Sequence, residues 1–112
     1  MTIPPQSFSG LLAVITDAGG GLTGFRRYIE AARAAALAEP DNAAAWMLLV
    51  LIAERFTRER FEEPITVEDS REAFERLRHI SGTLDDQFDG GDLGRQLSGL
   101  NLAAAMLAEM GR

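Results

Sequence analysis

The sequence contains no cysteine and no lysine, and it has only one histidine, one tryptophan and one tyrosine. Without cysteine, disulfide bonds, thiol nucleophiles and thiolate zinc sites are excluded. Without lysine, all eleven positive charges are arginines, so Schiff-base catalysis and a phosphate-loop lysine are excluded as well. These absences remove several large classes of enzyme and favour a non-catalytic protein.

Long apolar segments are also absent. The longest uninterrupted apolar run covers residues 43–53 and ends at Glu54, whereas a membrane-spanning helix needs about 20 such residues. The first residues carry no basic side chain ahead of an apolar stretch, which a secretory signal would require. We therefore expect a cytoplasmic protein without membrane contact, and the arginine-, alanine- and glycine-rich usage is typical of a GC-rich bacterial or phage genome.

The composition that remains is that of a folded domain. Hydrophobic residues make up 46% of the 112 residues and charged residues 25%, which is ordinary for globular proteins. A chain of this length can bury a core without covalent cross-links. We expect one domain that spans residues 1–112.

The spacing of apolar residues follows the 3.6-residue period of an α-helix in five segments, and no segment alternates as a strand would. The expected helices cover residues 5–17, 23–38, 42–61, 67–81 and 92–110. The third segment is apolar around most of its circumference and should therefore lie at the centre. The sequence predicts an all-α, compact five-helix bundle around this third helix.

Short polar residues mark where several of these helices should begin. Asp41 or Asn42 can cap the third helix and Asp92 the fifth, because their side chains accept hydrogen bonds from free N–H groups of a first turn. The fourth should begin near Thr66 or Asp69, where an acidic residue three positions after Asp69 imitates a capping box. The fifth carries one aligned apolar stripe: Leu93, Leu97, Leu100, Ala104 and Leu107.

Residues 19–24 fit the G-x-G-x-x-G pattern and, with the apolar residues before them, resemble the opening of a short-chain dehydrogenase. That family implies a nucleotide-binding loop and a catalytic Tyr-x-x-x-Lys motif, which a chain without lysine cannot supply. Asp17 and Thr23 also stand where the family has glycines. We favour a flexible hinge at residues 19–21, with a binding loop as the alternative.

The segment from Asp85 to Gly90 has acidic or amide residues at alternate positions, as at the start of an EF-hand calcium loop. The twelfth position of that loop would be Gln96, whereas calcium loops place a bidentate glutamate there. We favour a solvated acidic turn, with calcium binding as the alternative. No metal ion and no cofactor is expected.

Residues 25–53 resemble the junction between two tetratricopeptide helices. Phe25 and Tyr28 precede two alanines, a proline follows at position 40, and Trp46 and Leu49 come early in the next helix. The resemblance covers about a quarter of the chain, and no second copy follows at the 34-residue period of that family. It implies a helical hairpin that grips a peptide or protein, and ordinary bundle packing explains the same residues.

The charge is distributed unevenly along the chain. Residues 1–61 hold six acidic residues and six arginines, whereas residues 62–92 hold ten acidic residues and three arginines. The surplus of negative charge therefore falls on the fourth helix and its flanking loops. Such a region repels nucleic acid and attracts basic surfaces, although acidic residues also serve solubility and helix capping.

These features predict a non-catalytic protein–protein interaction domain, an acidic inhibitor or adaptor that docks on a basic partner. A nucleic-acid-processing protein is one such partner, as for immunity proteins and phage-encoded defence inhibitors. The expected partner-binding residues are Glu62, Glu63, Glu68, Glu72, Glu75, Asp85, Asp86 and Asp89. The alternative is a self-associating assembly subunit, such as a homodimer, that uses the apolar third helix. An enzyme in which Glu75 and His79 form a base is a third possibility.

Overall fold

The computed structural model describes residues 7–59 and 66–110, and every regular element in these residues is helical. The long helices are α2 (Leu22–Ala38), α3 (Ala43–Glu59), α4 (Val67–Phe88) and α5 (Leu93–Met110). Shorter elements are η1 (Ser9–Leu12), α1 (Ala13–Asp17), η2 (Pro40–Asn42) and η3 (Asp89–Gly91). The predicted all-α class is confirmed. The expected start of the first helix at residue 5 and the end of the third at residue 61 lie outside the described residues.

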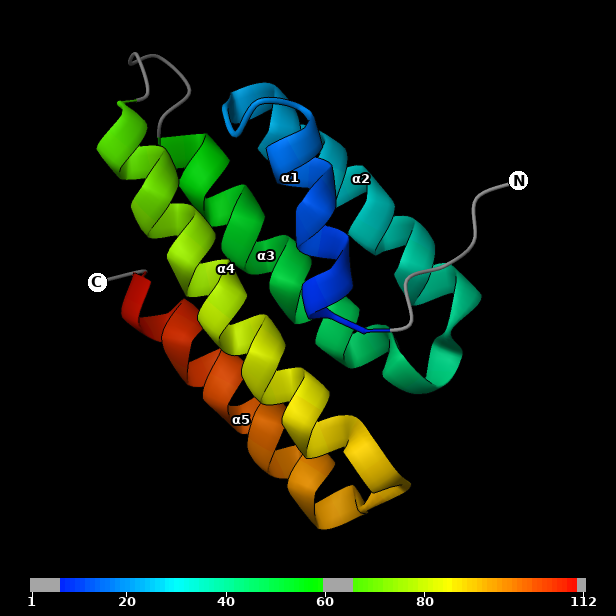
Figure 1. Ribbon diagram of the computed structural model, residues 1–112. Coiled ribbons are helices and arrows are strands. Elements are labelled where there is room, and N and C mark those ends of the chain that lie inside the picture. The colour runs from blue at the N-terminus through cyan, green and yellow to red at the C-terminus, as the bar shows by residue number, and fades with distance from the viewer. Residues whose placement is uncertain (1–6, 60–65, 111–112) are drawn as a thin grey trace.

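The helices form a flat bundle that measures 42 × 38 × 19 Å along its principal axes. The α2 and α3 helices pack against each other along their lengths, and α1 packs on α2. On the opposite side, α5 lies along the edge of the bundle beside α4 (Figure 1). Because α3 contacts α2, α4 and α5, it occupies the central position that the sequence predicts.

The apolar circumference of α3 is covered by these neighbours. Its buried side chains are Ala45, Trp46, Leu49, Val50, Ile52, Ala53 and Phe56. Leu51 is its one large apolar residue with substantial exposure, at 41%. The residues that carry the tetratricopeptide resemblance, such as Phe25, Tyr28 and Trp46, are also buried. Most apolar side chains of α3 are therefore buried against helices of the same chain.

The glycine run at residues 19–21 ends α1. The N–H of Gly20 donates to the carbonyl oxygen of Ile15 over 2.9 Å, and the N–H of Gly19 donates to that of Thr16 over 3.0 Å. These two bonds form a Schellman motif, in which the residue after the helix takes a left-handed conformation. Gly19 has the required φ of 92°. Two N–H groups of this run therefore bind the preceding helix.

The start of α4 and the start of α5 carry side-chain caps. The Thr66 hydroxyl accepts a hydrogen bond from the N–H of Asp69, and the Asp92 carboxylate accepts one from the N–H of Gly94. The cap predicted for the third helix at Asp41 or Asn42 stays a prediction. Both residues lie in the 3₁₀ turn Pro40–Asn42 that precedes α3, and the Asn42 amide donates to the Glu39 carboxylate over 3.1 Å.

The fourth helix is longer than the sequence suggested, because it ends at Phe88 and not near residue 81. Gly82, the residue directly after the predicted end, lies within α4 and is exposed. A glycine inside a helix costs about 1 kcal/mol. Ile80 and Leu84, on either side of it, are fully buried, and burial of each such side chain contributes about 1.5–3 kcal/mol. The helix continues because burial outweighs the cost of the glycine.

Only part of the aligned stripe of α5 faces the core, because Leu100 and Leu107 pack against it and the stripe's other residues are exposed. Leu93 and Leu97 are 74% and 59% exposed, whereas the small residues Gly99 and Ala103 are buried. A Cβ atom on Gly99 would lie only 3.0 Å from the Cβ atom of Gln87 on α4. Small residues thus allow α4 and α5 to approach closely, and they leave Leu93 and Leu97 exposed to solvent.

Two hydroxyl groups lie in the core. Tyr28 of α2 and Ser81 of α4 are both 0% exposed, and neither hydroxyl meets the geometry of a hydrogen bond with a described residue. Burial raises the pKa of Tyr28 far above its usual value of 10, and the Ser81 hydroxyl, near enough to interact, opposes part of that rise. The neutral tyrosine is therefore strongly favoured in the folded protein.

Among the described residues, no single helix has the length and apolar character of a membrane span. The α2 and α3 helices reach those limits only as a pair, and the pair is bent by 119° at its break.

Candidate docking site

The structure separates the acidic residues that the sequence marked as partner-binding. Glu68, Glu72 and Glu75 lie on the exposed side of the first half of α4. Asp85 and Asp86 lie near the end of α4, and Asp89 follows in η3. At a rise of about 1.5 Å per residue, Glu68 and Asp86 are ~27 Å apart along the helix. Glu62 and Glu63 lie outside the described residues.

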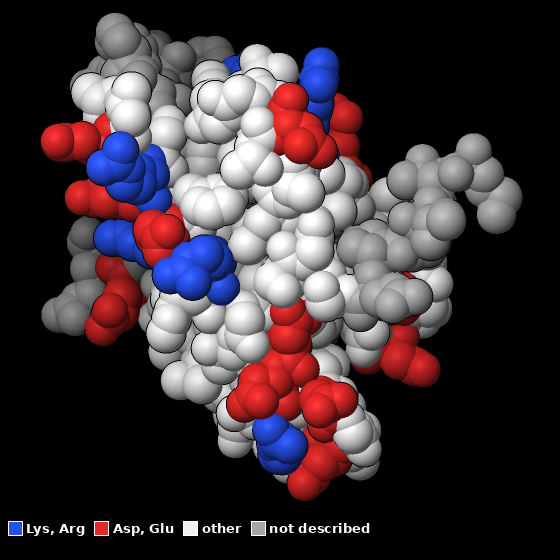
Figure 2. Space-filling view, in the orientation of Figure 1, with Lys and Arg blue, Asp and Glu red and all other residues white. Residues whose placement is uncertain are grey.

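Arginines offset the charge at the first half of α4. The described residues 67–78 contain four carboxylates and three guanidinium groups, which leaves one negative charge. Arg78 donates two hydrogen bonds to Glu75, over 2.9 and 2.6 Å, and lowers the pKa of that carboxyl. Glu75 thus pairs with Arg78, not with His79. Acidic and basic side chains alternate over this region (Figure 2).

The opposite end of α4 keeps its negative charge. We call the group Asp85, Asp86, Asp89 and Asp92 the acidic corner. The only basic residue between positions 79 and 100, apart from His79, is Arg95. Arg95 lies 3.5 Å from the Asp86 carboxylate and also donates to the Asp86 carbonyl oxygen over 2.8 Å. Red side chains gather with little blue where α4 meets α5 (Figure 2), so the corner has three uncompensated negative charges.

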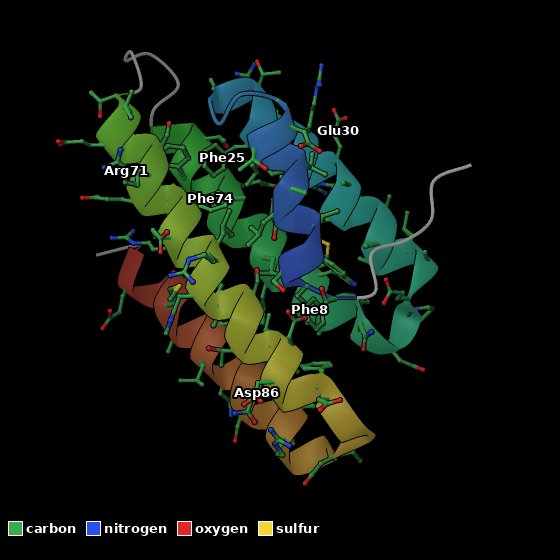
Figure 3. All side chains as sticks on the ribbon, in the orientation of Figure 1. Phe8, Phe25, Glu30, Arg71, Phe74 and Asp86 are labelled. Carbon is green, nitrogen blue, oxygen red and sulfur yellow. The ribbon has the colours of Figure 1, made fainter. Side chains whose placement is uncertain are left out.

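Within the acidic corner, Asp85 has a structural task. Its carboxylate accepts hydrogen bonds from the N–H groups of Phe8 and Ser9, over 2.6 and 3.1 Å, and from the Ser9 hydroxyl. Asp92 caps α5, as described above. Asp86 and Asp89 are exposed, and they are therefore the members of the acidic corner that are most accessible to a partner. Figure 3 shows Asp86 far from Arg71 along α4.

A cavity of about 630 Å³ opens beside the acidic corner. Its walls come from the start of η1, from the α2–α3 connection and from the end of α4. Four carboxylate residues line it: Glu39, Asp85, Asp86 and Asp89. Three aromatic residues line it as well: Phe8, Trp46 and Phe88. No basic residue is among the described residues of its lining.

The aromatic residues form one connected cluster. The ring of Phe8 lies 4.8 Å from that of Trp46, tilted by 54°, and 5.2 Å from that of Phe88, edge to face. Such separations are typical of favourable ring pairs. Phe8 belongs to the segment that Asp85 holds in place. The Asp85 carboxylate therefore positions the ring that contacts both Trp46 of α3 and Phe88 of α4.

Two polar atoms at this cavity lack partners. Trp46 is 1% exposed, and its indole N–H makes no hydrogen bond with any described residue. The Oε1 atom of Glu39 accepts a bond from the Asn42 amide, but its buried Oε2 atom accepts none from the described part of the chain. Both atoms are buried, so they are unpartnered groups inside the fold rather than groups exposed on the cavity wall.

Sequence reasoning missed Glu39, Trp46, Phe8 and Phe88 as residues of a site. Trp46 was assigned to helix packing, and Glu39 was assigned no role. Phe8 and Phe88 are far apart in sequence, and only the folded chain shows that they meet. The one available signal was the density of acidic residues after position 84, which marks one wall of the cavity.

A second cavity, of about 430 Å³, lies between the glycine run and the start of α4. Arg71 and Phe74 contribute to its lining. This lining has no buried polar side chain without a partner among the described residues. The described residues also contain no group of three or more His, Cys, Asp or Glu side chains that could hold a metal ion.

Comparison of the chain with protein-family models, with curated proteins and with solved structures finds no match.

Proposed function

We propose that the chain is a non-catalytic interaction domain, an inhibitor or adaptor whose acidic corner docks on a basic protein surface. The observation that carries this proposal is the uneven pairing of charge along α4. The first half has nearly as many arginines as carboxylates, whereas the acidic corner has Arg95 alone. A partner that is rich in arginine or lysine, such as a nucleic-acid-processing protein, would complement it.

The physical effect of such a corner is mainly on the rate and choice of association. A patch of one sign raises the rate of encounter with an oppositely charged partner by about 10- to 10³-fold and repels surfaces of its own sign. Nucleic acid itself is repelled. Because the carboxylates of Asp86 and Asp89 are exposed, added salt should screen their contribution within about 8 Å at physiological ionic strength.

The test compares two matched pairs of neutral variants on a fluorescent arginine-rich peptide. The first pair, Asp86→Asn with Asp89→Asn, removes the two accessible charges of the acidic corner and leaves Asp85 and Asp92 intact. The control pair, Glu68→Gln with Glu72→Gln, removes two charges from the first half of α4. We expect the first pair to weaken binding about tenfold at low salt, since each exposed charge contributes up to about 1 kcal/mol.

The control pair should weaken binding less than about twofold, because nearby arginines already offset those glutamates. An equal loss of affinity for both pairs of variants, or an affinity that does not change with salt concentration, would reject the acidic corner as the docking site.

A specific observation favours self-association as a second candidate function. The edge helix α5 exposes Leu93, Leu97 and Leu102, which are 74%, 59% and 52% accessible. Only two described residues of α5, Arg95 and Glu109, are charged. Leu102 lies on the opposite side of α5 from Leu93, about 180° around the helix. A weakly charged edge helix with an exposed leucine on one side suits contact with another apolar helix.

The arrangement of Arg95, Leu102 and Glu109 points to a second copy of the chain as the occupant. These residues follow one another at intervals of seven, so they share one side of α5. In an antiparallel pair with its two-fold axis at Leu102, Arg95 of each subunit would face Glu109 of the partner subunit. Burial of Leu102 contributes about 1–2 kcal/mol per subunit, which is less than association costs. The dimer should therefore be weak.

Sedimentation from about 10 μM to 1 mM tests this candidate. We expect concentration-dependent association for the native chain and none for Leu102→Glu. The matched control is Leu37→Glu, because Leu37 is 85% exposed on α2 and should not affect association. A native chain that stays monomeric throughout would reject self-association.

A further inference from the structure

We propose that one side of α5 binds an amphipathic helix of the partner, whose basic end then lies against the acidic corner. This inference rests on the proposed docking function and names the kind of segment that docks. The surface is a row of apolar side chains that we call the leucine seam: Leu93, Leu97, Leu100, Ala104 and Leu107. Their spacing of four, three, four and three residues is the heptad spacing at which one helix packs along another.

The fold covers only part of the leucine seam. Leu100 and Leu107 pack against the core, whereas Leu93 and Leu97 are 74% and 59% exposed and Ala104 is exposed as well. Figure 1 shows the reason, because the hairpin of α4 and α5 extends beyond the other helices at the end that carries η3. A contiguous exposed apolar surface marks an interaction site more often than a single exposed residue does.

No charged residue in the described part of α5 lies beside the leucine seam. At about 100° per residue, Arg95 and Glu109 are each about 160° around the helix from Leu93. The seam therefore offers apolar contact along its whole length, which is about 21 Å from Leu93 to Leu107. A partner helix of about four turns would cover it.

The charges at the ends of the seam are negative. Leu93 directly follows Asp92, and the turn before it carries Asp89, which is exposed. Glu109 is exposed near the other end of α5. An uncharged apolar row that ends in exposed carboxylates complements a helix that carries arginine or lysine beyond its apolar residues.

The same charges disfavour a second copy of the chain on the leucine seam. In an antiparallel pair with its axis at Leu100, Glu109 of the partner subunit would approach the turn that carries Asp89 and Asp92. In a parallel pair, the two acidic corners would meet. Like charges oppose association in both arrangements. Self-association through Leu102 uses the opposite side of α5 and does not occupy the seam.

The orientation of the partner helix follows from helix dipoles. Arginines are favourable in the last turn of a helix, where the macrodipole is negative. A partner helix that runs antiparallel to α5 places its last turn at Asp89. The ligand class is therefore an amphipathic helix with leucines at heptad spacing and arginines in its last turn, which is a common form of peptide recognition.

The probe is a fluorescent peptide of about 18 residues with this design, added to the full chain while its anisotropy is followed. One matched peptide has citrulline in place of each arginine, and another has alanine in place of each leucine. We expect micromolar affinity for the first peptide. The affinity of each matched peptide should be at least about tenfold lower at low salt.

A pair of protein variants locates the bound helix. Leu93→Gln with Leu97→Gln should lower affinity for the leucine peptide at least about tenfold, because most of the exposed seam is lost. The matched control is Leu102→Gln, since Leu102 is 52% exposed on the opposite side of the same helix, and its effect should be less than about twofold. Circular dichroism checks that each variant keeps the native helix content.

The charged end is tested separately. Asp89→Asn should lower affinity about threefold at low salt, as expected for one exposed charge. A nitroxide label at the arginine end of the peptide should broaden the amide resonances of residues 89–95. The same label at the other end should broaden those of residues 104–109. Broadening in the reverse order would overturn the proposed orientation.

The results separate this inference from the function on which it rests. An arginine-rich peptide that loses affinity on Asp86→Asn with Asp89→Asn, while the leucine peptide binds no more tightly than its alanine counterpart, would overturn the seam and keep the acidic corner. Equal affinity for the arginine and citrulline peptides would show apolar binding without charge recognition and would also overturn the inference. So would a loss on Leu102→Gln as large as on Leu93→Gln with Leu97→Gln.

Two further outcomes are decisive. A native dimer that Leu93→Gln with Leu97→Gln abolishes in sedimentation would assign the seam to a second copy and overturn the inference. Absence of binding by both the arginine-rich peptide and the leucine peptide would reject the acidic corner and the seam together.

Discussion

The buried hydroxyl of Tyr28 predicts how the fold responds to alkaline pH. The Tyr28 phenol has a higher pKa in the folded chain than in the unfolded chain. As long as the phenol is neutral in both states, its ionisation does not change the free energy of unfolding. Once the pH exceeds the unfolded value of about 10, the unfolded chain releases a proton that the folded chain retains. The stabilising contribution is complete below pH 10 and is lost progressively above it. Stability should therefore fall as the pH rises from 10.

The magnitude follows from linkage alone. One group that ionises only in the unfolded chain lowers the free energy of unfolding by about 1.4 kcal/mol at pH 11 and about 2 kcal/mol at pH 11.5. For a domain of this size, 1.4 kcal/mol lowers the Tm by roughly 5–10 °C. The composition makes this test unusually clean. The chain has one tyrosine and neither lysine nor cysteine, so no other side chain titrates between about pH 9 and 11.5.

The assay is thermal unfolding by circular dichroism at intervals between pH 9 and 11.5, with Tyr28→Phe as the matched control. The control keeps the ring and removes the ionisable hydroxyl, which has no hydrogen-bond partner among the described residues. We expect a flat Tm for the control and a falling Tm for the native chain. Phenolate absorbance that appears near pH 10 while the circular dichroism stays native, or parallel curves for both proteins, would refute the reasoning.

Three further predictions concern stability in urea, followed by circular dichroism. Gly24→Ala should destabilise by about 1–3 kcal/mol, because its Cβ would lie 2.8 Å from the carbonyl oxygen of Ile15. Gly82→Ala should stabilise by about 0.5–1 kcal/mol, since its Cβ meets nothing within 4 Å on an exposed helix surface. Asp85→Asn should cost about 1.5–3 kcal/mol through lost charge-assisted hydrogen bonds, and Asp89→Asn less than about 0.5 kcal/mol. A greater loss of stability for Gly82→Ala than for Gly24→Ala, or for Asp89→Asn than for Asp85→Asn, would contradict the structure.

The number and type of the helices could be predicted from the sequence because periodicity reports burial directly. The apolar circumference of residues 43–53 placed the third helix at the centre. Helix ends were less predictable where packing decides them. Gly82 is a poor helix residue on its own, and only the burial of Ile80 and Leu84 on the same helix explains why α4 continues to Phe88.

The orientation of α5 could be predicted only in part from its own residues. The aligned stripe is the more apolar side, yet the side with Gly99 and Ala103 is the buried one, and only Leu100 and Leu107 of the stripe pack against the core. The reason is steric and lies on another helix, where Gln87 and Leu84 leave no room for a larger residue at position 99. A hydrophobic pattern ranks the sides of a helix by transfer free energy and contains no information about how closely a neighbour approaches.

The same limit applies to the candidate site. The density of carboxylates after position 84 located one wall of the cavity, but the sequence treats every carboxylate there as equivalent. In the folded chain, Asp85 accepts N–H groups from Phe8 and Ser9, whereas Asp86 and Asp89 remain exposed. The donors that make this distinction lie more than seventy positions away. A reversal of charge at Asp85 would therefore disturb the segment that carries Phe8, and it would weaken any ligand bound against that ring without showing that Asp85 contacts the ligand. Only variants that spare this carboxylate can separate recognition by the acidic corner from the support that holds its aromatic wall.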